Sequence, residues 1–310
     1  MRRNDGRSGS GWRSRGSRTP PGEGAARAPH GCHDPAMAYA DEQVAPTVER
    51  CHEVIKELAG TWNVARDNAR FATTLDLAFA PVLFAHVAHS VQLATAVSEL
   101  HQTGHGLVMM PMVRQVIECS IRAVWLELYR GNLRAVLREG HRQRKNLLAS
   151  AVKATWLDAS DSVVRNADQR LEDDEATSGR NFERICAEIE GGDREYVLYR
   201  FASALTHPGN DLVEHCLEST DAAGSGIGFV TDPELGAADA WLGITAQHAL
   251  MAVCAWDRAE LGHPYRTELR SWAVEFGVDR DRPGMTGIGF QAANRAETRR
   301  RRASKRQRRS

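Results

Sequence analysis

Three charged side chains at helical spacing are the first candidates for chemistry in this sequence. Arg114, Glu118 and Arg122 recur at steps of four within an apolar stretch. On a helix with about 3.6 residues per turn these positions share one side, and opposite charges four residues apart attract each other. We therefore predict a polar strip that joins this helix to its neighbours as an interhelical cluster.

A second candidate group lies on a shorter expected helix, residues 195–206. Tyr199 and Arg200 stand near its middle, and His207-Pro208 ends it. Arg200 and His207 are seven residues apart, so they would project from nearly the same side. An arginine can stabilise negative charge on a phosphate, and a histidine can transfer protons. Arg200 and His207 are therefore the candidate catalytic residues.

Two resemblances rest on these residues. The step from Arg114 to Glu118, followed by Tyr199-Arg200 and then His207-Pro208, resembles a family of bacterial helical proteins of unknown function, over about residues 70–220. Separately, the spacing from Arg200 to His207 is similar to the Arg-x(4–6)-His motif of the HEPN ribonucleases of toxin and phage-defence systems. The second resemblance implies a metal-independent endoribonuclease that acts as a dimer.

A non-enzymatic interpretation of the same residues is favoured. In it, Arg200 pairs with Glu118 or another acid between helices, while His207-Pro208 only terminates a helix. Phe201 also stands where the HEPN motif usually has a polar residue. The sequence thus predicts a binding or regulatory protein, with an HEPN-like ribonuclease as the alternative.

Other signatures of catalysis or cofactor binding are missing from the sequence. It contains no P-loop, zinc-protease, calcium-loop or nucleophile-elbow motif. The glycine-rich run 224–229 is not preceded by a strand, so it is interpreted as a loop. His86 and His89 lack carboxylate partners at a matching spacing. We therefore expect no cofactor and no metal.

The charge of the chain is segregated although it sums to zero. Residues 1–36 contain seven arginines against three acids, and residues 294–310 contain nine Lys or Arg against one Glu. These ends carry +4 and +8, which leaves about −12 on the body. An acidic body disfavours nucleic-acid binding by the fold itself, so such binding is expected only as a nonspecific contact of the C-terminal tail.

The chain divides into a helical body between two basic tails. Residues 1–38 are rich in Arg, Gly and Ser, which predicts a disordered tail, and the composition changes so sharply at Met37 that translation is expected to begin there. Residues 39–280 are expected to form one helical domain, and residues 281–310 a disordered basic tail. The unpaired cysteines and the short apolar runs predict a cytoplasmic protein without a membrane span.

Apolar periodicity assigns the body to an all-α multi-helix bundle. The clearest helix carries Val44, Val48, Cys51, Ile55, Leu58 and Trp62 at steps of four and three. Further helices are expected at about 74–99, 108–129, 132–156, 182–189, 195–206, 235–261 and 265–276. Helix 235–261 is apolar nearly all round, so we expect it at the centre. Only residues 227–231 are expected to pair as strands. The expected binding partner of the bundle is an unknown protein or a second copy of the chain.

Overall fold

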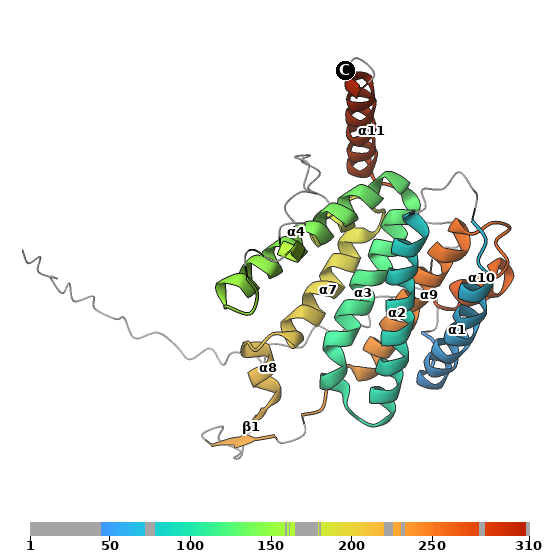
Figure 1. Cartoon of the computed structure of the whole chain (residues 1–310). Coiled ribbons are helices and arrows are strands. Elements are labelled where there is room, and N and C mark those ends of the chain that lie inside the picture. Colours follow the sequence, from blue (N-terminus) through green and yellow to red (C-terminus); the bar gives the residue numbers. More distant parts are fainter. Residues whose placement is uncertain are drawn as a thin grey trace, which may run out of the picture. The chain divides into compact units, whose positions relative to one another are not determined.

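The computed structural model describes most of the body and part of the C-terminal segment (Figure 1). The described residues are 45–71, 78–158, 160, 162–164, 179, 181–219, 226–230, 233–278 and 283–307. Within them the chain is an all-α multi-helix bundle with one short hairpin, which confirms the predicted fold class. The expected N-terminal tail 1–38 lies outside the described residues, as do most of residues 157–180, between the helices expected at 132–156 and 182–189.

The first helix, α1, follows the predicted apolar periodicity. It spans Val48–Asn68, and the hydroxyl of Thr47 caps it by accepting a hydrogen bond of 3.2 Å from the backbone N–H of Arg50. Its buried face consists of Cys51, Val54, Ile55, Leu58, Trp62 and Ala65. This stripe packs against α2 and α9, so the amphipathic pattern marks the face that the bundle buries.

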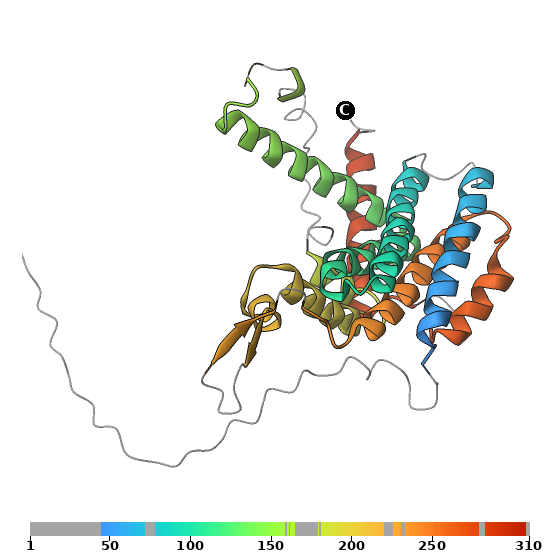
Figure 2. The ribbon, with the colours of Figure 1, turned by 90° about the horizontal axis from the view of Figure 1, so that it is seen from below.

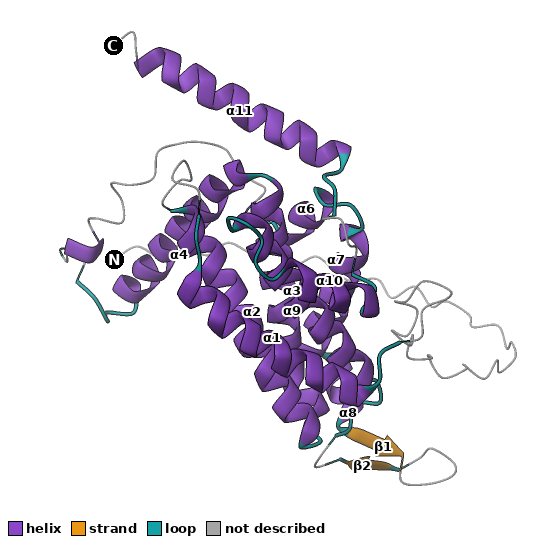
Figure 3. Cartoon of the chain, turned by 90° about the vertical axis from the view of Figure 1, so that its right-hand side faces the viewer, coloured by secondary structure: helices purple, strands orange, loops and turns teal. Residues whose placement is uncertain are grey.

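Helices α2 and α3 form an antiparallel pair joined by a short turn (Figures 1 and 3). Helix α2 spans Phe79–Gln102 and α3 spans Gly106–Leu128. Pro81 lies in the first turn of α2, where its missing N–H disturbs no intrahelical bond. By length and composition alone α2 is apolar enough to cross a membrane, and here it packs against α1, α3 and α9.

The next helices place the candidate residues. The one-turn helix η2, Arg130–Asn132, leads into α4, Leu133–Lys153, of which only the first turn is buried. Helix α6 spans Phe182–Ala187 and α7 spans Gly192–Thr206. Helices α6 and α7 both pack against α3, so the two predicted polar groups lie on neighbouring elements.

A hairpin follows the short helix α8, Asn210–His215. Strands β1, Leu217–Ser219, and β2, Ile227–Phe229, pair antiparallel, with Leu217 opposite Phe229. The local pairing predicted near residues 227–231 is therefore confirmed for residues 227–229. In Figure 2 the hairpin extends from the end of α8, at one end of the bundle.

Helix α9, Ala238–Ala259, is the central element that the sequence predicts. It contacts α1, α2, α3 and α10, and all but two of residues 241–257 are buried. Trp256 packs edge-on against Trp62 and Phe71, with ring centroids 5.1 and 5.0 Å away. Helix α10, Arg266–Glu275, then packs against α9 as the expected closing helix.

The C-terminal segment contains one helix. The sequence predicts a disordered basic tail for residues 281–310, and within this range Gly287–Gln307 form helix α11. Ala, Arg, Gln, Glu and Lys favour helix, and Glu297 pairs with Arg300 and Arg301 one turn later, at 3.1 Å each. The hydroxyl of Tyr129 also donates to the carbonyl oxygen of Ala293 at 3.4 Å. These local contacts offset the repulsion among the arginines.

Candidate functional site

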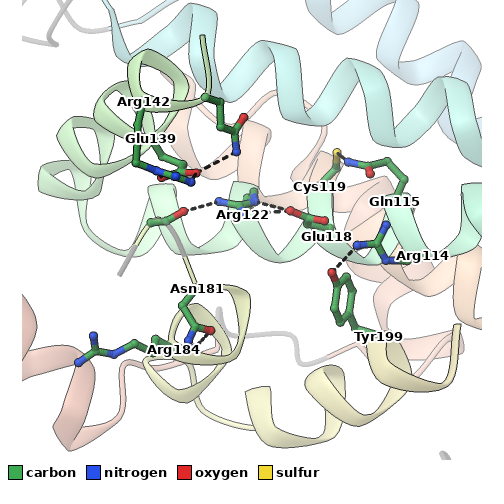
Figure 4. A network of polar contacts seen from close by, with 12 residues as sticks. Arg114, Gln115, Glu118, Cys119, Arg122, Glu139, Arg142, Asn181, Arg184 and Tyr199 are labelled. Carbon is green, nitrogen blue, oxygen red and sulfur yellow. Dashed lines mark hydrogen bonds and ion pairs between the residues drawn. The ribbon is translucent and has the colours of Figure 1, made fainter. Parts of the chain in front are cut away.

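The candidate site is a polar cluster between α3 and α7, and Arg114 is its bridge (Figure 4). Its Nη2 donates to the hydroxyl of Tyr199 at 2.5 Å, and its Nε donates to the hydroxyl of Ser203 at 2.9 Å. The guanidinium carbon also lies 4.9 Å from the centroid of the Tyr199 ring. Three contacts from one arginine thus fix α7 against α3.

Aromatic packing and a hydroxyl bond fix the orientation of the α7 partners. Ser203 donates to the carbonyl oxygen of Tyr199 at 2.7 Å, so its oxygen remains an acceptor for Arg114. The Tyr199 ring packs on Phe182 of α6, with centroids 4.4 Å apart. Tyr199 therefore joins three helices, a role that its place in the sequence does not reveal.

Glu118 and Arg122 form the second half of the cluster. Arg122 donates to Oε1 of Glu118 from Nη2 at 2.9 Å and from Nε at 3.1 Å, as the spacing of four predicts. Its Nη1 donates to the carbonyl oxygen of Gly179 at 3.2 Å. The two side chains are only 20% and 14% exposed, so this is a largely desolvated ion pair.

A histidine of α2 lies beside this pair. Burial, together with the charges of Arg122 and then His89, lowers the pKa of His86 to about 4. The imidazole is therefore neutral at physiological pH.

Among the described residues, no three His, Cys, Asp or Glu side chains come together as a metal site would require.

The structure places the two candidate catalytic residues at the outer surface. Arg200 is exposed, and its Nη1 lies 3.5 Å from the hydroxyl of Tyr196. His207 is also exposed and follows α7 with extended backbone, at φ −91° and ψ 144°. Because α7 ends at Thr206, His207 lies just outside the helix. The helical spacing that would place His207 on the same side as Arg200 therefore does not apply.

The interhelical pair expected between Arg200 and Glu118 is not formed. Glu118 bonds to Arg122 on its own helix, whereas Arg200 lies over Tyr196, 6.0 Å from the ring centroid. The physical reason is the rotation of α7, which turns Tyr199 and Ser203 toward α3 and Arg200 toward solvent. Arg114 takes the interhelical role that the sequence analysis gave to Arg200.

A buried pair between α7 and α9 was missed by the sequence analysis. Nε2 of His248 lies 2.7 Å from Oε2 of Glu195, and Nδ1 lies 2.8 Å from the carbonyl oxygen of Ile244. Both ring nitrogens thus face oxygen atoms, and these two contacts fix the orientation of the ring. The sequence feature that could have revealed this pair is a histidine within an otherwise apolar helix, because a buried polar side chain requires a hydrogen-bond partner.

A second buried polar contact joins α3 to α6. The indole Nε1 of Trp125 donates to Oε2 of Glu188 at 2.7 Å, and both side chains are buried. Such a bond satisfies a carboxylate that would otherwise be costly to bury. With the clusters of Arg114 and Glu195, it completes a set of polar contacts that orient the helices around α3.

The fold and the cluster define a helical bundle whose elements are joined by directional polar contacts. Residues 80–224 match the model of a family of unknown function, DUF5677. This segment runs from α2 past β1 and includes Arg114, Glu118, Arg122, Tyr199, Arg200 and His207. No curated protein and no solved structure matches the chain. The expected resemblance to a family of unknown function is therefore shown over residues 80–224.

Proposed function

We propose that this protein is a non-catalytic binding protein that forms a homodimer through the outer face of α7. The observation that carries the proposal is the exposure of two apolar side chains one turn apart. Val197 and Phe201 are 51% and 49% exposed, whereas Leu198 and Ala202 on the inner face are buried. An apolar pair on a well-packed helix is typical of a contact surface.

The inner contacts make α7 a rigid platform for such a surface. Arg114 anchors the middle of the helix to α3, and Glu195 anchors its first turn to His248 of α9. A helix that is already ordered loses little conformational entropy when a partner binds. This preorganisation supports binding through the outward face rather than a change of conformation.

A second copy of the chain is the occupant that the pattern favours. Twofold contacts require a patch that is complementary to itself, and an apolar pair at positions i and i+4 meets that condition. Val197 can pack against the partner's Phe201, and the reverse contact follows by symmetry. Val213 on the adjoining helix α8 is also exposed and can extend the interface.

The surroundings of Arg200 and His207 support a binding role over a catalytic one. Arg200 is directed to Tyr196, and no hydrogen bond orients the His207 ring in the described structure. A general base works when a neighbour holds it toward the proton that it transfers. Neither residue lies in the pocket between α9 and α10 described below.

The test is the mass of the full chain in solution. We expect sedimentation equilibrium to give a dimer for the wild type and a monomer for Phe201→Asp, because a buried charge without a partner opposes association. Val64→Asp on α1 is the matched control, since Val64 is 54% exposed on another helix, and it should remain dimeric. A wild type that stays monomeric at the highest soluble concentration would refute the proposal.

The ribonuclease is the second candidate, supported by the exposure of both Arg200 and His207. Dimerisation through α7 would bring two such pairs to one interface, as the HEPN resemblance implies. Purified protein is incubated with RNA in EDTA. Cleavage that is lost in His207→Ala would establish this candidate over the non-catalytic role, whereas intact RNA at high protein concentration would exclude it.

A further inference from the structure

A pocket of about 660 Å³ lies outside the α3–α7 cluster. Its walls come from the end of α3, the last turns of α9, helix α10 and the segment that enters α11. The last wall is held in place, because the N–H of Glu190 donates to the carbonyl oxygen of Gly284 at 2.9 Å and the N–H of Thr286 donates to that of Glu188 at 3.1 Å. The volume is in the range that suits a small organic ligand.

The inner wall of the pocket is apolar. Leu128, Cys254, Leu269 and Ala273 line it, and each is at least nine-tenths buried. Met285 and Phe290 are further apolar residues of the lining. A ligand that enters this space would therefore remove apolar surface from water, which favours an aromatic or aliphatic body.

The rim of the pocket carries an excess of positive charge. Of its three arginines, Arg258 is bonded to Glu127, with Nε 3.3 Å from Oε2. Arg266 and Arg270 lie one turn apart on α10, and the described structure gives their guanidinium groups no hydrogen bond or ion pair. Two exposed arginines at this spacing can hold one anion between them.

The only other carboxylate in the lining, Asp257, is directed into the protein. Its Oδ1 accepts a hydrogen bond of 3.0 Å from the N–H of Tyr265, and the side chain is buried. Burial raises the pKa of Asp257, although the Tyr265 bond and the charges of His263, Arg258 and Arg266 oppose that effect. In the described structure Asp257 bonds to the Tyr265 backbone and forms no ion pair with an arginine of the rim.

His263 adds a third donor from a strained backbone position. Its φ of 47° lies in the left-handed region, which is unfavourable for a residue with a Cβ. Nδ1 donates to the carbonyl oxygen of Asp257 at 2.7 Å, and in the imidazolium form of the ring Nε2 can donate to a bound anion. Strain of this kind often accompanies ligand sites, and here it directs the ring to the lining of the pocket.

We propose that this pocket binds an organic phosphate, with the phosphate group at Arg266, Arg270 and His263 and the apolar or aromatic body against Leu269 and Ala273. A phosphate offers three terminal oxygens, one for each of these donors, and arginine matches that geometry well. The inference does not depend on dimerisation through α7. It assigns a ligand site to a part of the chain that lies largely beyond the family match.

Isothermal titration calorimetry of the full chain tests the proposal, with AMP, adenosine and inorganic phosphate as probes. AMP should bind saturably, and each of the other two should bind at least about tenfold more weakly, because each lacks one half of the contacts. Absence of saturable AMP binding would overturn the proposal. Equal affinity for inorganic phosphate would overturn the assigned role of the apolar wall.

Two matched double variants distinguish the loss of specific contacts in the pocket from a change in the net charge of the protein. Arg266→Gln/Arg270→Gln should weaken AMP binding by about tenfold or more, because the two charge-assisted contacts are lost. Arg134→Gln/Arg144→Gln removes the same charge from exposed positions of α4 and should leave the affinity unchanged. Equal affinity of both variants for AMP would refute the site. If the first variant unfolds at a lower temperature than wild type, Arg270→Gln alone provides the comparison.

Discussion

Replacing Glu195 by alanine should destabilise the bundle more than any surface substitution on α7. The change removes the carboxylate that lies 2.7 Å from Nε2 of His248 and leaves that fully buried ring without one of its two acceptors. Removal of one partner of a buried ion pair typically costs about 3–5 kcal/mol, because the remaining charge is uncompensated. We expect a loss of that size in the free energy of unfolding.

Glu195→Gln separates charge from shape. The amide can still form a hydrogen bond to the His248 ring, so the expected loss is smaller, about 1–2 kcal/mol. Glu99→Ala, an exposed position of α2, is the control and should change stability by less than about 0.5 kcal/mol.

The same pair predicts a pH dependence with a definite sign. Burial by itself would raise the pKa of Glu195, but the charge of His248 and its hydrogen bond outweigh burial and lower the pKa below the ordinary value of 4.5. A lowered carboxylate pKa stabilises the fold above about pH 4.5, and this contribution is lost as the pH falls through the folded-state pKa. The stability difference between wild type and Glu195→Gln should therefore shrink in acid.

Urea unfolding followed by circular dichroism gives the free energies at pH 7 and at a series of acidic pH values. The ordering of the losses should be alanine, then glutamine, then the Glu99→Ala control. A loss below about 1 kcal/mol for Glu195→Ala at pH 7 would show that the pair is not a buried charged contact. A difference between wild type and Glu195→Gln that is constant with pH would refute the lowered pKa.

Three further predictions concern other contacts. Arg114→Met should cost roughly 1–3 kcal/mol in urea unfolding, because two hydroxyl groups lose their donor, and a change within error would exclude a bridging role. Gly192→Ala should destabilise by about 1–3 kcal/mol, because its Cβ would lie 2.0 Å from the carbonyl oxygen of Cys186, whereas Gly60→Ala has no atom within 4 Å and should stabilise α1 slightly. Burial raises the pKa of the Cys186 thiol to about 12, so iodoacetamide at pH 8 should label half-buried Cys216 before Cys186, as peptide mass spectrometry can show.

The sequence predicted where helices form and which side of each is buried. The steps of three and four from Val48 to Trp62 became the inner face of α1, and the small apolar residues of 235–261 became the central helix α9. Such patterns are local, because side chains three and four residues apart share a face of any helix. The ion pair between Glu118 and Arg122 was predictable for the same reason.

Two opposing local effects act on the C-terminal segment. A block of like charges favours an extended chain, whereas the helix-forming residues and the ion pairs around Glu297 favour α11. Both effects can be read from the sequence, but the balance between them cannot.

The partners across helices were decided only by the tertiary structure. The spacing on α7 cannot tell whether Tyr199 or Arg200 faces α3, because that depends on how the helix is rotated in the bundle. Likewise, Glu195 and His248 meet only because α9 packs at the centre. Periodicity in a sequence specifies the buried face of a helix, whereas the contacts between faces depend on packing among segments that are far apart along the chain.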